Sequence, residues 1–216
     1  KPCCRSAKAN PEMPQAIWQQ VQRALLSESD VLQAVPHNLA ELESFLPEAE
    51  AFAPASVLCG LVPRVDGLHV LLTKRSPHLR HHPGQISFPG GRIETADPNP
   101  FQTALREAHE EIGLQADNVC LLGYLDPLVT ITGYRVFPAV ALLDPGYRAE
   151  PDGVEVTELF EAPLSLFLDA GNEHPFEIEF RGAVRNLKEF RWQDYRIWGA
   201  TASMLINLRT RLGALS

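Results

Sequence analysis

Three glutamates near the middle of the chain lie at spacings that place them on one face of a helix. Residues 106–114 read Arg-Glu-Ala-His-Glu-Glu-Ile-Gly-Leu. Side chains three and four positions apart are neighbours on a helix, so Glu107, Glu110 and Glu111 are expected to stand together. Like charges this close repel one another unless a cation lies among them. The pattern therefore fits a divalent metal site, although a solvated acidic helix face has the same appearance.

The ends of this helix can be predicted from local signals. Asn99 is a typical N-cap residue, Pro100 suits the first helical position, Gln102 completes a capping box and Gly113 suits the helix end. The apolar positions at helical spacing form the buried stripe, namely Phe101, Ala104, Leu105, Ala108 and Ile112. At about 100° per residue, the glutamates are centred roughly 120° from this stripe. We therefore expect them to lie beside the hydrophobic core and not in it.

A basic, glycine-rich segment precedes the predicted helix. From Lys74 to Arg92 there are four Lys or Arg, three His and no acidic residue, although the whole chain has a formal net charge of -8. Cationic side chains and exposed backbone N–H groups bind phosphates, and phosphorylated ligands often bring a divalent cation with them. Gly90-Gly91 permits a tight turn and a close approach of the backbone, although such pairs are frequent in solvated turns. The segment favours a phosphate-bearing ligand next to the carboxylates.

Length and composition limit the alternatives. A chain of 216 residues can bury a sizeable core as one domain, which we place at residues 15–216 after an N-terminal tail of residues 1–14. The acidic balance and a sequence pI near 5.4 argue against nucleic-acid binding as the main role. The apolar runs are too short to span a membrane. The four cysteines, at positions 3, 4, 59 and 120, have no zinc-site spacing, which favours a cytoplasmic location.

The rest of the chain alternates between strand-like and helix-like patterns. Apolar runs on either side of Asp66-Gly67 predict a β-hairpin. Strands are predicted at residues 55–62, 68–74, 86–88, 119–125, 135–143, 154–160, 176–181 and 187–192. Further helices are predicted at residues 15–26, 39–45, 164–170 and 204–212. Strands interrupted by helices indicate an α/β protein with a mixed sheet between helical layers.

The glycine pair and the glutamate helix together resemble a Nudix box. Gly91 is followed after five residues by Asp97, and after eight more residues by the segment 106–114. The family pattern has Glu in place of Asp97 and one residue fewer before the arginine. The longer spacing is a feature of one subgroup, the coenzyme A pyrophosphatases. A second signature of that subgroup resembles residues 71–76, 79–80, 82, 84–85 and 88–91, and shorter matches lie at residues 103–108, 132–134 and 198–202.

This resemblance implies a Nudix-type α/β/α sandwich with a mixed β-sheet, in which the box forms a loop-helix-loop motif. It also implies a hydrolase that depends on Mg²⁺ or Mn²⁺. The three glutamates would be the metal ligands, assisted by the backbone of Gly91. Arg106 would act with them by orienting a glutamate through an ion pair network, and either Asp97 or Glu94 would be its partner.

The resemblance further implies a substrate and a general base. Coenzyme A pyrophosphatases cleave the diphosphate of coenzyme A to 4'-phosphopantetheine and 3',5'-ADP. The residues expected to bind this substrate are Lys74, Arg75, Arg80, His82 and Gly90. The general base would be a glutamate of the box or Glu155, which matches the family's distal Glu-Val segment.

Two other interpretations remain beside this one. A Nudix hydrolase of another nucleoside diphosphate derivative, such as NADH or ADP-ribose, would use the same basic segment. A Nudix-fold binding module without catalysis is disfavoured, because such a module has no need of three repelling glutamates. The expected partner is a small molecule and not nucleic acid or a membrane. The resemblance to the family is also compatible with a homodimer.

Overall fold

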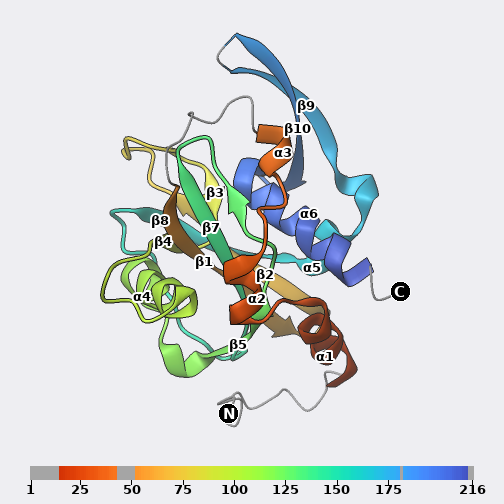
Figure 1. Cartoon of the computed structure of the whole chain (residues 1–216). Helices are drawn as coiled ribbons and strands as arrows, with labels where there is room; N and C mark the ends of the chain where they lie inside the picture. The colour runs from red at the N-terminus through yellow and green to blue at the C-terminus, as the bar shows by residue number, and fades with distance from the viewer. Residues whose placement is uncertain (1–14, 43–51, 181, 214–216) are drawn as a thin grey trace.

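The computed structural model describes residues 15–42, 52–180 and 182–213. Its larger sheet has eight strands, and the main path through it follows the order β3-β2-β1-β7-β5 (Figure 1). The predicted hairpin is present, because β1 (Ala53–Arg64) pairs antiparallel with β2 (Gly67–Arg75). β1 also pairs in parallel with β7 (Tyr134–Leu143), so the sheet is mixed, as predicted.

Shorter strands complete the larger sheet. They are β3 (Ile86–Ser87), β4 (Gly90–Arg92), β5 (Val119–Tyr124), β6 (Leu128–Val129) and β8 (Val156–Pro163). β4 pairs with the first half of β1, β6 pairs with β7, and β8 pairs with β2. Because β1 and β2 are antiparallel, the start of β1, the end of β2, β4 and the start of β8 meet at one end of the sheet. Segments far apart in the sequence therefore converge at this end.

Helices cover both faces of the larger sheet (Figure 1). α4 (Pro100–Ile112) packs on one face, and α5 (Leu164–Leu168) and α6 (Gly199–Gly213) pack on the other. Alternate residues of β2 serve the two faces, because Leu71 packs in the core under α4 while Leu72 packs in the core under α5 and α6. The predicted α/β/α sandwich is confirmed.

A smaller sheet lies beside α6. Its strands follow the order β11-β10-β9, with β9 (His174–Phe180), β10 (Ala183–Trp192) and β11 (Tyr195–Trp198). The hairpin of β9 and β10 projects away from the larger sheet (Figure 1). Phe190 of β10 and Ile197 of β11 are fully buried in the core cluster that also contains α5 and α6. This burial holds β11 against the larger sheet, in contact with β3.

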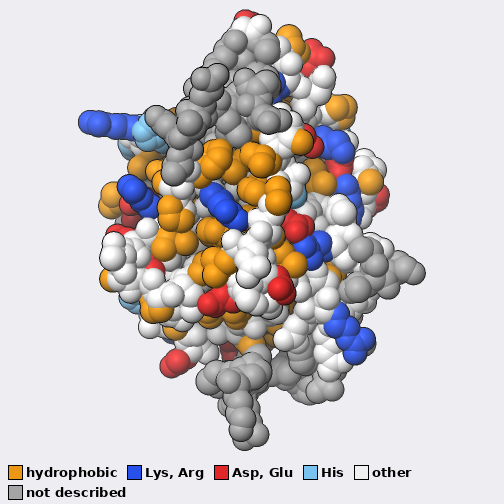
Figure 2. Space-filling view, viewed as in Figure 1, with side chains coloured by type: hydrophobic (Ala, Val, Ile, Leu, Met, Phe, Trp, Pro, Cys, Tyr) orange, Lys and Arg blue, Asp and Glu red, His pale blue; other side chains and the backbone are white. Residues whose placement is uncertain are grey.

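In the described residues before β1 there are three short helices, namely α1 (Gln15–Ala24), α2 (Glu28–Gln33) and α3 (Leu39–Leu42). The sequence pattern does not predict α2. This helix has only six residues and is defined by its cap, since the Ser27 side chain accepts a hydrogen bond from the Asp30 N–H. Hydrophobic side chains gather around α2 and α3 on the face seen in Figure 2.

Other features also differ from the predictions or lie beyond them. Gly90-Gly91 lies in strand β4 and not in a tight turn. α6 begins at Gly199 and not at residue 204, because small residues in its first turn leave no apolar pattern to detect. The predicted tail of residues 1–14 and the end of the helix predicted at 39–45 lie outside the described residues. Among the helices described, none is both long and apolar enough to cross a membrane.

Asp126, which follows β5, binds α6 to the larger sheet. Arg211 donates to it from Nε at 2.8 Å and from Nη2 at 2.5 Å, and the Asn207 amide donates at 2.9 Å. Burial acts to raise the pKa of Asp126, but these hydrogen bonds outweigh burial and hold the pKa below its usual range. A carboxylate of this kind stabilises the fold above its unfolded pKa and loses that contribution as the pH falls through its folded pKa.

Replacing Asp126 by Asn should lower the free energy of unfolding by about 1–2 kcal/mol at neutral pH, because Asn keeps one acceptor but loses the charge. Urea denaturation at several pH values should show this difference undiminished down to about pH 5 and shrinking below about pH 4. Asp117→Asn, at an exposed position, is the matched control and should show neither effect. A difference that persists unchanged in acid would contradict the role of the ionised carboxylate.

Candidate active site

Helix α4 is fixed at both ends by the signals seen in the sequence. The Asn99 side chain accepts a hydrogen bond from the Gln102 N–H at 3.0 Å, and Pro100 is the first helical residue. Gly113 has a left-handed φ of 65°, and its N–H bonds to carbonyls of the preceding turn. The predicted helix and both of its caps are confirmed, so the position of the glutamate face is set by local interactions.

The three glutamates of α4 lie in different environments. The side chain of Glu110 is 57% exposed, that of Glu107 is 17% exposed and that of Glu111 is 5% exposed. The expectation that all three lie beside the core does not hold for Glu111, because Gly90 of β4 and Arg75 of β2 pack over it. Two carboxylates are therefore largely removed from water, and the third faces solvent.

The glycines of β4 bring the backbone against these two carboxylates. The Gly90 N–H donates to Glu111 Oε2 at 3.2 Å. A Cβ atom at Gly91 would lie 2.4 Å from the carboxylate carbon of Glu107, and a Cβ atom at Gly90 would lie 2.4 Å from the Ser56 carbonyl oxygen. Backbone atoms of β1 leave no room for a side chain at Gly90, and a side chain at Gly91 would displace the Glu107 carboxylate. The predicted close approach of the backbone is confirmed, in a strand instead of a turn.

Arg106 connects the carboxylates to the loop before α4. It binds Asp97 through Nη2 at 3.0 Å and Nε at 3.2 Å, and its Nη1 lies 2.8 Å from Glu107 and 3.3 Å from Glu110. The hydrogen bonds from Arg106 lower the pKa of Asp97 to about 2, and those to Asp97 raise the pKa of Arg106. Of the two candidate partners, Asp97 is the one that pairs with Arg106, while Glu94 donates its backbone N–H to Asp97.

Arg75 faces Glu111 from the end of β2. Its Nη1 lies 3.9 Å from Glu111 Oε1, and its buried Nε has no hydrogen-bond partner among the described residues. Burial raises the pKa of Glu111 to about 8, against the opposing effects of Arg75 and the Gly90 N–H. Burial also raises the pKa of Glu107, against the opposing effect of Arg106. Both buried carboxylates would therefore be stabilised in their ionised form by a further positive charge.

The loop before β8 brings Glu155 to the same cluster. The Ser76 N–H donates to the Glu155 carbonyl at 2.8 Å, and the Asp152 N–H donates to the Glu111 carbonyl at 2.9 Å. The side chain of Glu155 is exposed, and its charge contributes to raising the pKa of Glu107 and of Glu111. Asp152, which the sequence analysis did not single out, holds this loop by accepting the Glu155 N–H at 3.0 Å. Its place just before a glycine is the sequence signal for such a turn.

The other predicted substrate residues are not joined to this cluster. Lys74 pairs with Glu158 at 2.7 Å, on the face of β2 opposite to that of Arg75. Arg80 and His82 are exposed, and His82 Nδ1 lies 2.9 Å from Gln85 Oε1. In the described part of the chain, no hydrogen bond or ion pair connects these three side chains to the glutamates of α4. The structure therefore places only Arg75 and Gly90, of the predicted substrate residues, against the carboxylates.

The donor set of this cluster suits a hard divalent cation that is only partly enclosed by protein. Within the described ranges, no three His, Cys, Asp or Glu side chains converge where they could hold a metal ion. Glu107 and Glu111 face the backbone of Gly90-Gly91, while Glu110 turns toward Arg106. Mg²⁺ is commonly held by one or two carboxylates, with water and substrate phosphates as its other ligands. The carboxylates of Glu107 and Glu111, beside the backbone of Gly90-Gly91, match this mode of binding.

Known proteins resemble this chain over most of its length. A family model described as NUDIX domain matches residues 54–189. The Nudix hydrolase NudL of Enterobacter sp. (strain 638), described as uncharacterized, is 38% identical over 159 residues, which are 74% of this chain and 82% of that protein. NudL of Escherichia coli (strain K12) is 40% identical over 162 residues, with the same coverage of 74% and 82%. The crystal structure of the Nudix hydrolase RenU from M. smegmatis has a TM-score of 0.47 at 24% identity, over 56% of this chain and 79% of that chain.

Replacing Gly91 by Ala should disturb the carboxylate pair without unfolding the protein. The added Cβ would lie 2.4 Å from the Glu107 carboxylate, which must then rotate away from the backbone of β4. We expect Mn²⁺ binding, measured by isothermal titration calorimetry, to weaken at least about tenfold. Gly213→Ala is the matched control, since a Cβ there meets no atom within 4 Å. Equal Mn²⁺ affinity in wild type and Gly91→Ala would contradict the placement of the metal site.

Proposed function

The chain belongs to the Nudix family, and we propose that within this family it hydrolyses the diphosphate bond of coenzyme A or its derivatives, with Mg²⁺ or Mn²⁺ as cofactor. The family makes it a hydrolase of nucleoside diphosphate derivatives, and Nudix hydrolases generally use divalent metal ions of this kind. The choice of coenzyme A rests on the signature at residues 71–91, together with the longer spacing between Gly91 and Arg106.

The proposal of a hydrolase is carried by the carboxylate pair of Glu107 and Glu111 against the backbone of β4. A diphosphate reacts slowly with water because its negative oxygens repel a nucleophile. A site for such a group must therefore supply positive charge at a defined position. When bound, a Mg²⁺ or Mn²⁺ ion would neutralise diphosphate oxygens and lower the pKa of a water molecule.

The residues around this pair have separable roles in the proposed reaction. Glu107 and Glu111 would hold the cation, and Arg106 keeps Glu107 in place through their 2.8 Å ion pair. The Arg75 guanidinium, 23% exposed beside Glu111, would donate to an oxygen of the diphosphate. In the reaction, the oxygen of water bonds to one phosphorus, the bridging P–O bond breaks, and the second phosphate group leaves with the bridging oxygen.

The proton that water loses requires an acceptor, and we assign this role to Glu155. Its carboxylate is exposed, unlike that of Glu111, and its loop is anchored both to the end of β2 and to the end of α4. The raised pKa of Glu111 and of Glu107, to which the charge of Glu155 contributes, indicates that the three groups share one electrostatic environment. A carboxylate at the rim can exchange its proton with solvent after each turnover.

The sequence signature that supports coenzyme A lies in strands β2, β3 and β4, next to the candidate site. Residues 71–75 are the second half of β2, residues 86–87 form β3, and residues 90–91 begin β4, whose backbone contacts both buried glutamates. The intervening loop carries the exposed side chains of Arg80 and His82, which could contact the extended parts of a long substrate.

Incubation with Mn²⁺ and a panel of coenzyme A, acetyl-coenzyme A, NADH and ADP-ribose tests the substrate assignment. We expect 4'-phosphopantetheine and 3',5'-ADP from coenzyme A, at a kcat/KM at least about tenfold above those for NADH and ADP-ribose, which corresponds to about 1.4 kcal/mol. Preferential cleavage of NADH or ADP-ribose would contradict the assignment of coenzyme A and make the cleaved compound the preferred substrate. No cleavage of any of the four would contradict the proposed hydrolase.

Glu107→Gln and Glu111→Gln should each lower kcat for the preferred substrate by at least about a hundredfold, because an amide is a poor ligand for Mg²⁺. Circular dichroism and thermal unfolding are expected to show folded proteins. Glu177→Gln, on the exposed side of β9, is the matched control and should keep the activity of the wild type. Near-normal turnover of both variants at saturating Mg²⁺ would contradict the assignment of Glu107 and Glu111 as metal ligands.

Glu155→Gln should lower kcat by about 10²–10⁴-fold and leave the affinity for Mn²⁺ nearly unchanged, because a general base acts on water and does not hold the cation. Single-turnover kinetics and calorimetry measure the two effects separately. The control is Glu150→Gln, in the same connection between β7 and β8 and also exposed. A loss of Mn²⁺ affinity equal to the loss of rate would instead make Glu155 a metal ligand.

A further inference from the structure

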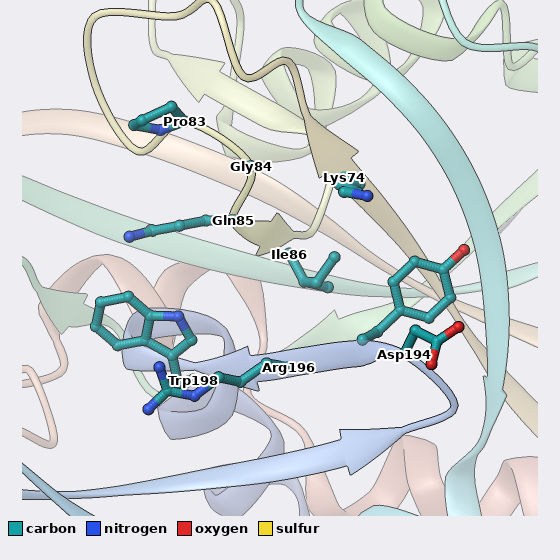
Figure 3. A pocket seen from close by; sticks show the side chains of 9 residues that line it. Lys74, Pro83, Gly84, Gln85, Ile86, Asp194, Arg196 and Trp198 are labelled. Atoms are coloured by element: carbon teal, nitrogen blue, oxygen red, sulfur yellow. The ribbon is translucent and has the colours of Figure 1, made fainter.

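A pocket of about 310 Å³ lies between the larger and the smaller sheet (Figure 3). One wall is formed by Lys74 of β2 together with the segment 83–86 that leads into β3. The opposite wall is formed by Asp194, Tyr195, Arg196 and Trp198, which come from β11 and the turn before it. Its volume is at the lower end of the range for small-molecule sites. Nothing in the proposed chemistry at Glu107 and Glu111 uses this pocket.

The pocket and the carboxylates lie on opposite faces of the larger sheet. Successive side chains of a strand point to opposite faces, and Lys74 and Arg75 are adjacent on β2. Arg75 reaches Glu111 on the side of α4, while Lys74 lines the pocket on the side of β11. Both sites nevertheless lie at the same end of the sheet, because both adjoin the end of β2.

A short stretch of chain connects the two sites. Ile86 lines the pocket, and Gly90 donates its N–H to Glu111. Four residues of extended chain span at most about 13 Å, at about 3.3 Å per residue. This upper limit is of the order of the length covered by a sugar and a phosphate arm in an extended nucleotide. The two sites are therefore close enough for one extended nucleotide that passes around the end of the sheet.

The pocket has the walls that a flat ring requires. Ile86, 5% exposed, forms an apolar floor between the two groups of side chains seen in Figure 3. The Trp198 indole is held edge-to-face against Phe176, with ring centroids 5.9 Å apart. The Arg196 guanidinium lies over the Phe176 ring at 4.4 Å and near the Trp198 ring at 5.6 Å. Rings and guanidinium planes fixed in this way offer surfaces on which a heterocycle stacks.

The charges around the pocket favour a neutral ring over a phosphate. Lys74 is paired with Glu158 at 2.7 Å, and the buried Glu189 is shared by Arg191 and Arg196. Asp194 adds an exposed carboxylate to the rim. The three cations and the three carboxylates of this group balance, so the pocket offers a phosphate no excess positive charge. A ring that offers both donors and acceptors would instead match the Asp194 carboxylate and the Gln85 amide.

We propose that the pocket between β3 and β11 binds the adenine base of the nucleotide whose diphosphate lies at the carboxylates. Trp198 provides the stacking surface, and Asp194 accepts a hydrogen bond from the exocyclic amine of the base. This inference rests on the proposed function, because the adenine belongs to the proposed substrate. It adds a base-binding site, built by the smaller sheet, to a reaction centre built by the larger one.

Binding of adenosine 5'-monophosphate to the metal-free full chain, measured by calorimetry in EDTA, tests the pocket without any turnover. Trp198→Ala should weaken this binding at least about tenfold, and Trp198→Phe, which keeps a ring, should restore most of it. Inosine 5'-monophosphate, whose ring has an oxygen in place of the amine, should bind wild type about tenfold more weakly than the adenosine nucleotide. Asp194→Asn should remove this preference, because an amide can donate to that oxygen.

Asp169→Asn, at an exposed position away from the pocket, is the control and should keep both affinities. Equal binding of the two nucleotides by wild type, or no effect of Asp194→Asn and Trp198→Ala, would overturn the base site even if coenzyme A is cleaved. Conversely, pocket-dependent binding of the adenosine nucleotide in a protein that does not cleave coenzyme A would support the base site and contradict only the proposed function. Thermal unfolding of each variant separates a lost contact from a lost fold.

Discussion

The contacts of one guanidinium organise the reaction centre. Arg106 binds Asp97 in the loop before α4, Glu107 and Glu110 on its own helix, and the carbonyl of Arg92 at the end of β4. These bonds join the loop, the helix and the strand at one point, and they leave the carboxylate of Glu107 against Gly91, where no side chain would fit. If this guanidinium were absent, the carboxylates of Asp97, Glu107 and Glu110 would repel one another without a cation between them.

The negative charge of Glu111 is not fully compensated by the groups around it. Burial of Glu111 raises its pKa to about 8, and neither the Gly90 N–H nor Arg75 at 3.9 Å offsets that burial. A divalent cation between Glu107 and Glu111 would complete the charge balance. On the other face of the same strands, the charges beside the pocket at β11 balance one another. At this end of the larger sheet, the face with α4 suits a metal ion and a diphosphate, and the face with β11 suits a neutral ring.

Local features of the chain could be predicted from sequence, and features that depend on packing could not. The cap at Asn99 and the stop at Gly113 depend on residues within four positions of one another, and both are confirmed. Of the predicted stripe of α4, Ala104, Ala108 and Ile112 are fully buried, whereas Phe101 and Leu105 are only partly buried. The burial of Glu111 depends on β4, which is about twenty residues away in the sequence, so the angle between helix faces could not reveal it. The strand at Gly90-Gly91 forms because β1 supplies its partner, against the local preference of glycine for a turn.

The most direct test of this account is a crystal of the full chain soaked with Mn²⁺, with anomalous scattering measured at the manganese edge. The account predicts a peak between the carboxylates of Glu107 and Glu111, next to the backbone of Gly91, with water or substrate phosphate as the remaining ligands. It also predicts that Arg106 stays bound to Asp97 when the metal is present. A manganese ion bound elsewhere, with Glu107 and Glu111 not coordinating it, would contradict the central claim.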